Sequence, residues 1–267
     1  MNNPFIIWVI AIIITLASVY YQSITGPTYP KSGNVTFDDR EIEYKFLRSH
    51  PGTDDCSISI KTDDKDIKAY LVWKRFKTDD EWTKTEMKYF NGVHIAVLPN
   101  QPPAGKLMYE IQLEKENTQL TVPEDKPVVI RFRGSVPATI LIPHIIAMFC
   151  VMLLSTRAGL EIFRKEPQYK KLTLWTLGFL LVGGMILGPL VQKFAFGEYW
   201  TGFPFGMDLT DNKTLIALIG WIIALIAVYK FKKPKYWVLG AAVLTLVIFL
   251  IPHSVLGSEL DYSKMKK

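Results

Sequence analysis

The fold of this chain is decided by residues 136–154, which read VPATILIPHIIAMFCVMLL. This run contains no Asp, Glu, Lys or Arg, and it carries a single histidine, His144. Because a helix rises about 1.5 Å per residue, a run of this length can cross the hydrocarbon core of a bilayer. The stretch therefore predicts a transmembrane helix with an imidazole near one end.

Four further apolar runs without charged residues lie on either side of this one, at 4–20, 172–191, 214–229 and 236–251. Together they predict five transmembrane helices. The first run could instead be a cleaved signal peptide, but no basic residue precedes it and no convincing small-x-small cleavage site lies before Val19, so we expect an uncleaved anchor. Three domains follow: an anchor at 1–29, a polar domain at 30–134 and a four-helix transmembrane domain at 135–267.

Charge is divided unevenly along the 267 residues. The whole chain has 31 Lys and Arg against 25 Asp and Glu, whereas the polar segment 30–134 has 17 against 18. The positive excess therefore belongs to the apolar remainder. A nucleic-acid-binding protein would carry its basic stripe on the folded polar domain, so this class is disfavoured, and no nucleotide-binding motif is present either.

The basic residues near the apolar runs gather in two loops. They are Arg157, Arg164, Lys165, Lys170 and Lys171 in one, and Lys230, Lys232, Lys233 and Lys235 in the other. Loops rich in Lys and Arg stay in the cytoplasm. We therefore expect a multi-pass protein of the cytoplasmic (inner) membrane, with its N-terminus inside. The polar domain, the loop 192–213 and the C-terminus are then extracytoplasmic.

The polar segment changes to short alternating runs such as CSISIK, DIKAYLVWKR and KLMYEIQLE, separated by turn clusters. About eight strands in a hundred residues are typical of an antiparallel β-sandwich. The predicted fold class is therefore an α+β membrane protein, with five transmembrane helices and an extracytoplasmic antiparallel β-sandwich between the first and second. Cys56 and Cys150 lie in different domains and predict no disulfide.

The stretches 69–73, 94–99 and 107–111, which read AYLVW, HIAVLP and LMYEI, carry a resemblance. They resemble the immunoglobulin-like or fibronectin-III-like modules of bacterial surface proteins. The resemblance implies a domain that binds, spaces or docks, and seldom catalyses.

The tetrapeptide Leu-Ile-Pro-His occurs twice, at 141–144 and 250–253. The predicted orientation places both histidines, His144 and His253, at outer helix ends. An ionisable side chain at that depth normally faces a bundle interior or a cavity, and the preceding proline bends the helix. The two histidines are therefore candidate ligands; the alternative is that each hydrogen-bonds a neighbouring helix.

The outer loop 193–213 contains six aromatic residues, including Tyr199 and Trp200. Aromatic side chains favour the membrane interface, so the loop either lies on that interface or folds over a flat apolar ligand. Asp208 or Asp211 is placed to cap the helix that follows.

This loop is similar to the tryptophan-rich haem-handling loop of the membrane proteins of cytochrome c synthesis. The resemblance implies that Tyr199 and Trp200 form a haem platform and that Asp211 and Lys213 end the motif. It also implies that His144 and His253 ligate the iron. Phe203 and Phe205 stand where that family has tryptophans.

Two neutral imidazoles suit haem b or a transition metal, and the carboxylates of Asp208 and Glu259, expected on the same face, could join His144 and His253 in a metal site. No zinc-protease or serine-hydrolase motif is present, so we expect a protein that is not an enzyme; a membrane enzyme that uses the outer carboxylates and histidines is a further alternative. The sequence predicts haem or metal binding at the extracytoplasmic rim, in electron transfer or cytochrome assembly. The alternative is a non-catalytic membrane scaffold or assembly factor whose β-sandwich docks an extracytoplasmic or membrane protein partner.

Overall fold

The structure is a computed structural model that describes residues 3–252 and 259–264. The chain divides into two compact units. The helical unit comprises residues 1–27 and 136–258, and the β-domain comprises residues 28–135 and 259–267. The α+β class is as expected. The division differs from the expected boundaries in two respects, because the first helix joins the later helices and the C-terminal segment joins the β-domain.

The helical unit is built from eight elements in the described residues. They are α1 (Pro4–Thr25), α2 (Ala138–Gly159), η1 (Leu160–Phe163), α3 (Tyr169–Leu180), η2 (Leu181–Leu187), α4 (Gly188–Phe196), α5 (Leu209–Lys230) and α6 (Lys235–Leu250). Four helical stretches among the described residues are long and apolar enough to cross a membrane: α1, α2 with η1, the continuous stretch α3–η2–α4, and α5. The apolar helix α6 is shorter, with 16 residues.

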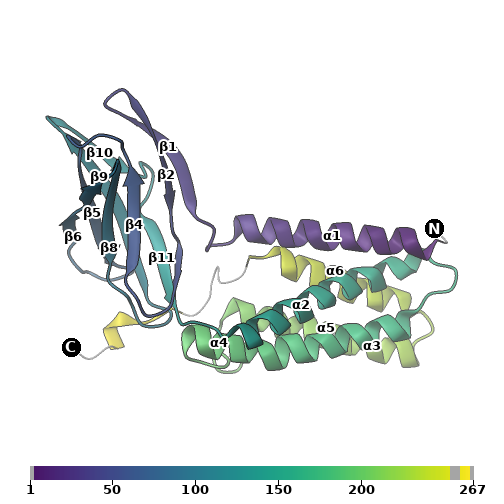
Figure 1. The fold of residues 1–267 in the computed structure, drawn as a ribbon. Helices are drawn as coiled ribbons and strands as arrows, with labels where there is room; N and C mark the ends of the chain where they lie inside the picture. Colours follow the sequence, from purple (N-terminus) through teal and green to yellow (C-terminus); the bar gives the residue numbers. More distant parts are fainter. Residues whose placement is uncertain (1–2, 253–258, 265–267) are drawn as a thin grey trace. The chain divides into compact units, whose positions relative to one another are not determined.

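The helices of this unit lie side by side (Figure 1), and contacts between side chains identify which ends meet. At one end the Arg157 guanidinium of α2 lies 5.2 Å from the ring centroid of Trp8 in α1, and Lys170 of α3 lies 4.7 Å from that of Tyr229 in α5. This is the end of the unit that carries the N-terminus and the two basic loops.

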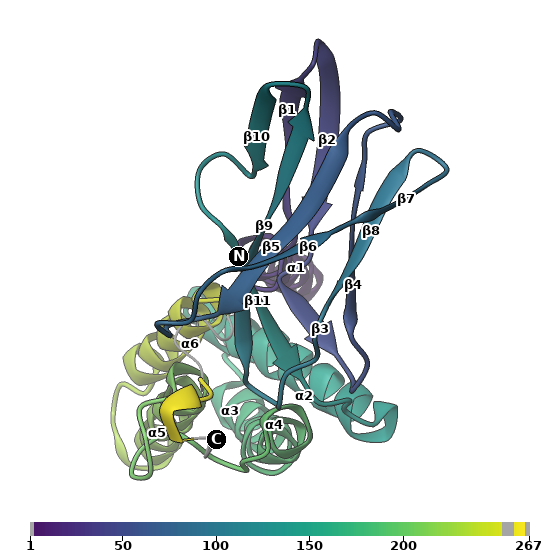
Figure 2. The same cartoon turned by 90° about the vertical axis from the view of Figure 1, so that its left-hand side faces the viewer.

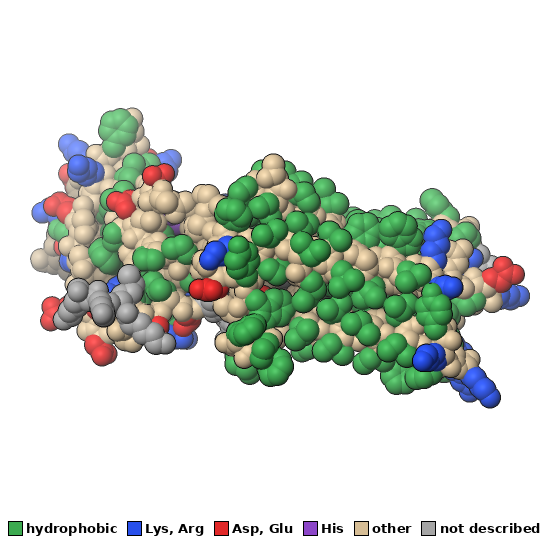
Figure 3. All heavy atoms as spheres, turned by 90° about the horizontal axis from the view of Figure 1, so that it is seen from below, with side chains coloured by type: hydrophobic (Ala, Val, Ile, Leu, Met, Phe, Trp, Pro, Cys, Tyr) green, Lys and Arg blue, Asp and Glu red, His purple; other side chains and the backbone are tan. Residues whose placement is uncertain are grey.

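Apolar side chains cover most of the helical unit on the face shown in Figure 3, and Lys and Arg gather near the basic-loop end. Ile146, Ile216 and Val247 are among the many apolar side chains that are about half exposed. Its interior is formed largely by Trp221 and small residues such as Ala217 and Ala224. An exposed apolar surface of this extent is typical of helices that face lipid.

The β-domain contains eleven strands in the described residues. They are β1 (Lys31–Phe37), β2 (Arg40–Phe46), β3 (Ser49–Pro51), β4 (Cys56–Lys61), β5 (Lys68–Arg75), β6 (Thr83–Glu86), β7 (Lys88–Phe90), β8 (Val93–Leu98), β9 (Lys106–Lys115), β10 (Thr118–Val122) and β11 (Val128–Arg133). The run 83–90 is divided at the buried Met87, so that β6 pairs with β5 and β7 pairs with β8.

Three sheets make up this domain (Figure 2). The largest has the order β3-β11-β9-β5-β6, and β10 also pairs with β9. The second sheet has the order β4-β8-β7, and the third is the hairpin of β1 and β2. All pairings are antiparallel except that of β3 with β11, which is parallel. The expected sheet is therefore antiparallel in the main and includes one parallel edge.

Apolar side chains alternate along these strands, and their burial holds the sheets together. In β4 and β9 every second side chain is buried, which gives each sheet one apolar face. These faces share a single core whose largest members include Phe46, Tyr109 and Phe132. The buried Tyr109 hydroxyl donates a hydrogen bond to the Leu47 carbonyl, at 2.8 Å. All buried residues of this core lie between positions 35 and 132.

Candidate functional site

His144 lies in the second turn of α2 and hydrogen-bonds to the neighbouring π-helical segment η2. Its Nδ1 atom lies 2.9 Å from the carbonyl oxygen of Gly183, which also accepts from the Gly188 N–H. Because a carbonyl can only accept, Nδ1 carries the proton, and when the ring is neutral Nε2 keeps its lone pair. His253, the expected second ligand, lies outside the described residues.

The aromatic loop is held in place by the first turn of α5. The Asp211 carboxylate is buried, and its Oδ2 accepts hydrogen bonds from the N–H groups of Thr201 and Gly202, at 2.6 and 3.0 Å, and from the Thr201 hydroxyl. Asn212 Oδ1 accepts from the Phe203 N–H at 2.7 Å. Asp211 therefore fixes the conformation of the loop by accepting hydrogen bonds from the loop's backbone N–H groups. Of the two expected caps, Asp208 is the one at the N-cap position of α5, where it accepts from the Thr210 N–H.

The two expected platform residues make local contacts within this loop. Trp200 Nε1 donates to the Phe203 carbonyl at 3.1 Å, and the Lys193 ammonium lies 5.2 Å from the Tyr199 ring centroid. The most exposed apolar side chains of the loop are Phe205 and Met207, at 82 and 85%. The loop thus presents apolar side chains at its surface.

Lys213 is buried in α5, where its ammonium donates to the Ile251 carbonyl at the end of α6, at 2.9 Å. The Gln22 amide of α1 reaches the same oxygen, at 3.5 Å. Free carbonyls at a helix C-terminus attract cations, so Lys213 serves as a cap that joins three helices. No group of three or more His, Cys, Asp or Glu within residues 3–252 and 259–264 is arranged to hold a metal ion.

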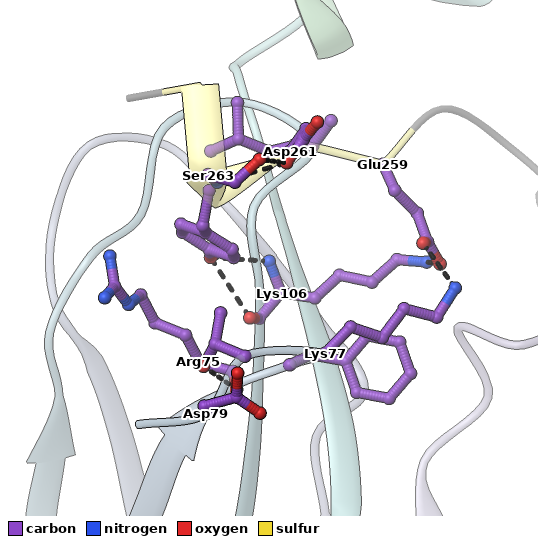
Figure 4. Close-up of a pocket in the computed structure, with 12 residues that line it drawn as sticks. Arg75, Lys77, Asp79, Lys106, Glu259, Asp261 and Ser263 are labelled. Carbon is purple, nitrogen blue, oxygen red and sulfur yellow. Dashed lines mark hydrogen bonds and ion pairs between the residues drawn. The ribbon is translucent and has the colours of Figure 1, made fainter. Parts of the chain in front are cut away.

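Glu259, the remaining expected metal ligand, belongs to the β-domain and is bound by two lysines (Figure 4). Its carboxylate accepts from Lys77 at 2.7 Å and from Lys106 at 2.6 Å. Lys77 lies in the turn after β5, and Lys106 begins β9. The Leu260 N–H donates to the Ala104 carbonyl at 3.2 Å, which aligns the C-terminal segment with the β8–β9 loop.

Tyr262 fixes the same segment three residues further on. Its hydroxyl accepts from the Lys106 N–H at 2.9 Å and lies 3.1 Å from the Lys106 carbonyl and from Gln101 Oε1, to either of which it can donate. The Arg75 guanidinium lies 5.1 Å from the centre of its ring and is itself held by Asp80 through two hydrogen bonds. The side chain of Tyr262 is therefore bound at both its polar tip and its aromatic face.

A pocket of about 500 Å³ lies beside this segment. Its lining combines the β5–β6 turn, including Phe76 and Asp79, with Lys106 and the C-terminal residues Leu260 and Ser263. A volume of this size is in the range of ordinary ligand sites. The pocket is thus bounded partly by the β-strand framework and partly by a segment that follows the last helix.

The electrostatics of the site favour an ionised Glu259 and a protonated Tyr262. Burial by itself raises the pKa of Glu259, but the hydrogen bonds from Lys106 and Lys77 outweigh it and lower that pKa overall. Burial raises the pKa of Tyr262 and lowers that of Lys106, with the Glu259 carboxylate opposing the latter change. The site is suited to an anionic group next to a neutral phenol.

The sequence alone did not identify Lys77, Lys106 and Tyr262 as a group. Lys106 and Tyr262 are 156 residues apart, and no spacing rule connects them. The available signal was compositional: an acidic and aromatic stretch at 259–262, and the basic residues Lys74, Arg75 and Lys77 around the end of β5.

Comparison with known protein families, with curated proteins and with solved structures finds no match to this chain.

Proposed function

We propose that this protein is a non-catalytic docking protein of the cytoplasmic membrane, with five spanning helices and a β-domain presented outside the cytoplasm. On this proposal the β-domain is a sandwich, with the six-stranded and three-stranded sheets packed on their shared core. The β-domain recruits a partner protein, and the helices anchor the β-domain at the bilayer.

The orientation is supported by the positions of the helix ends. The N-terminus and both basic loops share one end of the helical unit, as the contacts of Trp8 with Arg157 and of Lys170 with Tyr229 require. Basic loops remain in the cytoplasm, so the opposite end is extracytoplasmic.

The docked C-terminal segment supports a fifth span. Residues 259–264 sit on the β-domain, so an even number of crossings must separate β11 from Glu259. The helix α2, the stretch α3–η2–α4 and α5 provide three. On this proposal the short helix α6 provides the fourth.

The observation that carries the docking function is the Glu259–Tyr262 site itself. One surface of the β-domain holds a peptide segment through a backbone hydrogen bond, a carboxylate bound by two lysines and a tyrosine niche. These are the elements by which binding modules recognise peptides: main-chain hydrogen bonds for affinity and side-chain niches for specificity.

Photocrosslinking tests this function. A photoreactive amino acid at Asp79, which lines the pocket, should join the full-length protein in its native membrane to a second polypeptide. The same probe at Glu43, an exposed position on β2, is the matched control and should give no such adduct. The proposal fails if Asp79 forms no intermolecular adduct, or if both positions form the same one.

Haem or metal binding at the rim is a second candidate, which the protonation of His144 favours. An imidazole that donates from Nδ1 to a backbone carbonyl is oriented as metal-ligating histidines commonly are, with Nε2 available. Protein purified from haem-replete cells should then show a Soret band or bound iron or copper that His144→Ala removes. Colourless, metal-free protein would exclude this candidate and leave the docking function unaffected.

A further inference from the structure

The C-terminal segment docks on a β-domain whose core is complete without it. Among the described residues none beyond position 132 belongs to that core, and within 259–263 only the Tyr262 side chain is buried. The segment ends in the short helical turn Tyr262–Lys264 and adds no strand to a sheet. The segment therefore lies on the surface of the folded domain as a bound peptide ligand would, and it is not part of the domain's framework.

Its contacts are of the kind that exchange. The Lys77 side chain is 66% exposed and that of Glu259 is 35% exposed, so water and salt weaken their ion pair. The set is completed by the Lys106–Glu259 ion pair, in which the Lys106 side chain is 15% exposed, by one backbone hydrogen bond of 3.2 Å, and by the tyrosine niche with Arg75 over the ring. Because the segment is tethered to the chain, a high effective concentration keeps it in place even if each contact is weak.

We propose that this surface is a recognition site for peptides with the pattern Glu-x-x-Tyr supplied in trans, and that Glu259–Tyr262 is its competing ligand in cis. This inference rests on the proposed docking function and specifies its ligand. The pattern follows from the contacts, since the carboxylate must reach Lys77 and Lys106 while the phenol reaches the Lys106 main chain.

The site distinguishes this ligand from close analogues. Phenylalanine in place of the tyrosine would leave the Lys106 N–H without its acceptor, and glutamine in place of the glutamate would remove the charge that the two lysines neutralise. The pocket beside the segment leaves room for larger side chains than Asp261 and Ser263. A partner peptide can therefore make contacts that the chain's own segment lacks.

Peptide binding to the full-length protein in detergent or nanodiscs tests the proposal. The double variant Glu259→Gln/Tyr262→Ala releases the segment, and a fluorescent peptide of sequence SELDYSK, which matches residues 258–264, is titrated by anisotropy. We expect saturable binding to the released variant and at least ten-fold weaker binding to the unaltered protein, whose own segment occupies the site. Peptides with Phe for Tyr or Gln for Glu should bind at least several-fold more weakly, and a scrambled peptide should not bind.

Controls make the result specific to this surface. Adding Lys106→Ala to the released variant should weaken binding at least several-fold, whereas adding Lys45→Ala, at an exposed position on β2, should leave it unchanged. The buried Cys56 thiol should stay unreactive towards maleimide in every variant, which shows that the β-domain is folded.

Three outcomes would overturn the proposal: no saturable binding to the folded released variant, equal binding to released and unaltered protein, or equal binding of the scrambled peptide. These outcomes are separable from failure of the docking function. If Asp79 captures a partner but the peptide does not bind, only the ligand pattern is wrong. The mass of the captured adduct further distinguishes a second copy of this chain from a different protein.

Discussion

At His94, burial decides the protonation state of a side chain. The imidazole is 2% exposed on β8, opposite Ile60 of β4 and Tyr89 of β7. Burial lowers the pKa of His94, and the nearby Asp64 offsets this only in part. The ring is therefore neutral in the folded domain and becomes protonated more readily when the domain unfolds.

This predicts a loss of β-domain stability on acidification. Because the folded pKa lies below the unfolded one, stability falls as the pH drops below about 6.5, with a slope of at most about 1.4 kcal/mol per pH unit. His94→Phe should remove that component of the slope, as measured by denaturant unfolding between pH 7 and 5. An unchanged slope in the variant would show that another group titrates.

Asp211 is the candidate-site residue whose role is most open to a direct test. If its carboxylate holds the aromatic loop, Asp211→Ala removes the acceptor to which the Thr201 and Gly202 N–H groups donate, at about 1–3 kcal/mol for each bond. We expect faster proteolysis within 197–208 and a lower Tm in detergent. Glu198→Ala, which removes an exposed carboxylate of the same loop, is the control and should change neither.

At the scale of the elements, α1 is packed as a member of the bundle. Ile7 and Ala11 are fully buried against the other helices, while Ile13 is 59% exposed. The Trp8 ring lies beside the Arg157 guanidinium of α2, which is paired with the buried Glu161 of η1. These contacts favour the expectation that the first helix is kept as an anchor.

The prediction is that α1 stays bound after the chain is cut behind it. With a protease site inserted near Thr28, cleaved α1 should co-purify with the remainder in detergent. Ala11→Leu overpacks a filled position, at a cost of about 1–3 kcal/mol, and should release the helix. Ile13→Leu, at an exposed position of the same helix, should not. Release of α1 from the unaltered protein would contradict this packing.

How well each element could be predicted depended on how local its signal was. The apolar runs identified α1 to α6, and alternation identified most strands, because both patterns lie within a few residues. The strand β1 was not expected, since its turn to β2 is made by Asp38 and Asp39, both with positive φ, and not by the more familiar Asn-Gly.

The candidate site was less predictable, for a physical reason. Sequence pattern could nominate Asp208 or Asp211 as a cap, but only tertiary contacts with Thr201 and Gly202 distinguish their roles. The docking of Glu259 and Tyr262 depends on residues more than 150 positions away, where no periodicity operates. His253 lies outside the described residues, so the pairing of His144 with His253 stays a prediction.

At the scale of the whole molecule, the proposed five-span topology makes an accessibility prediction. In a background of Cys56→Ala and Cys150→Ala, a membrane-impermeant maleimide should label Glu116→Cys in the β9–β10 turn and Ser263→Cys in the C-terminal segment of intact spheroplasts. Lys232→Cys, in the α5–α6 loop, should react only after the membrane is opened. If Glu116→Cys is labelled and Ser263→Cys is not, α6 does not cross the membrane and the C-terminal segment does not dock on the β-domain.

The hairpin of β1 and β2 has a consequence for how the domain bears tension. It is a two-stranded sheet of its own, yet β1 is the strand that follows α1 directly, whereas β11, which leads to α2, lies between β3 and β9 in the largest sheet. Two-stranded ribbons are marginally stable by themselves. A pulling force transmitted from α1 therefore reaches the domain first through β1 and β2, which have the fewest strand neighbours. Single-molecule extension should record a small opening step of this hairpin before the main unfolding event.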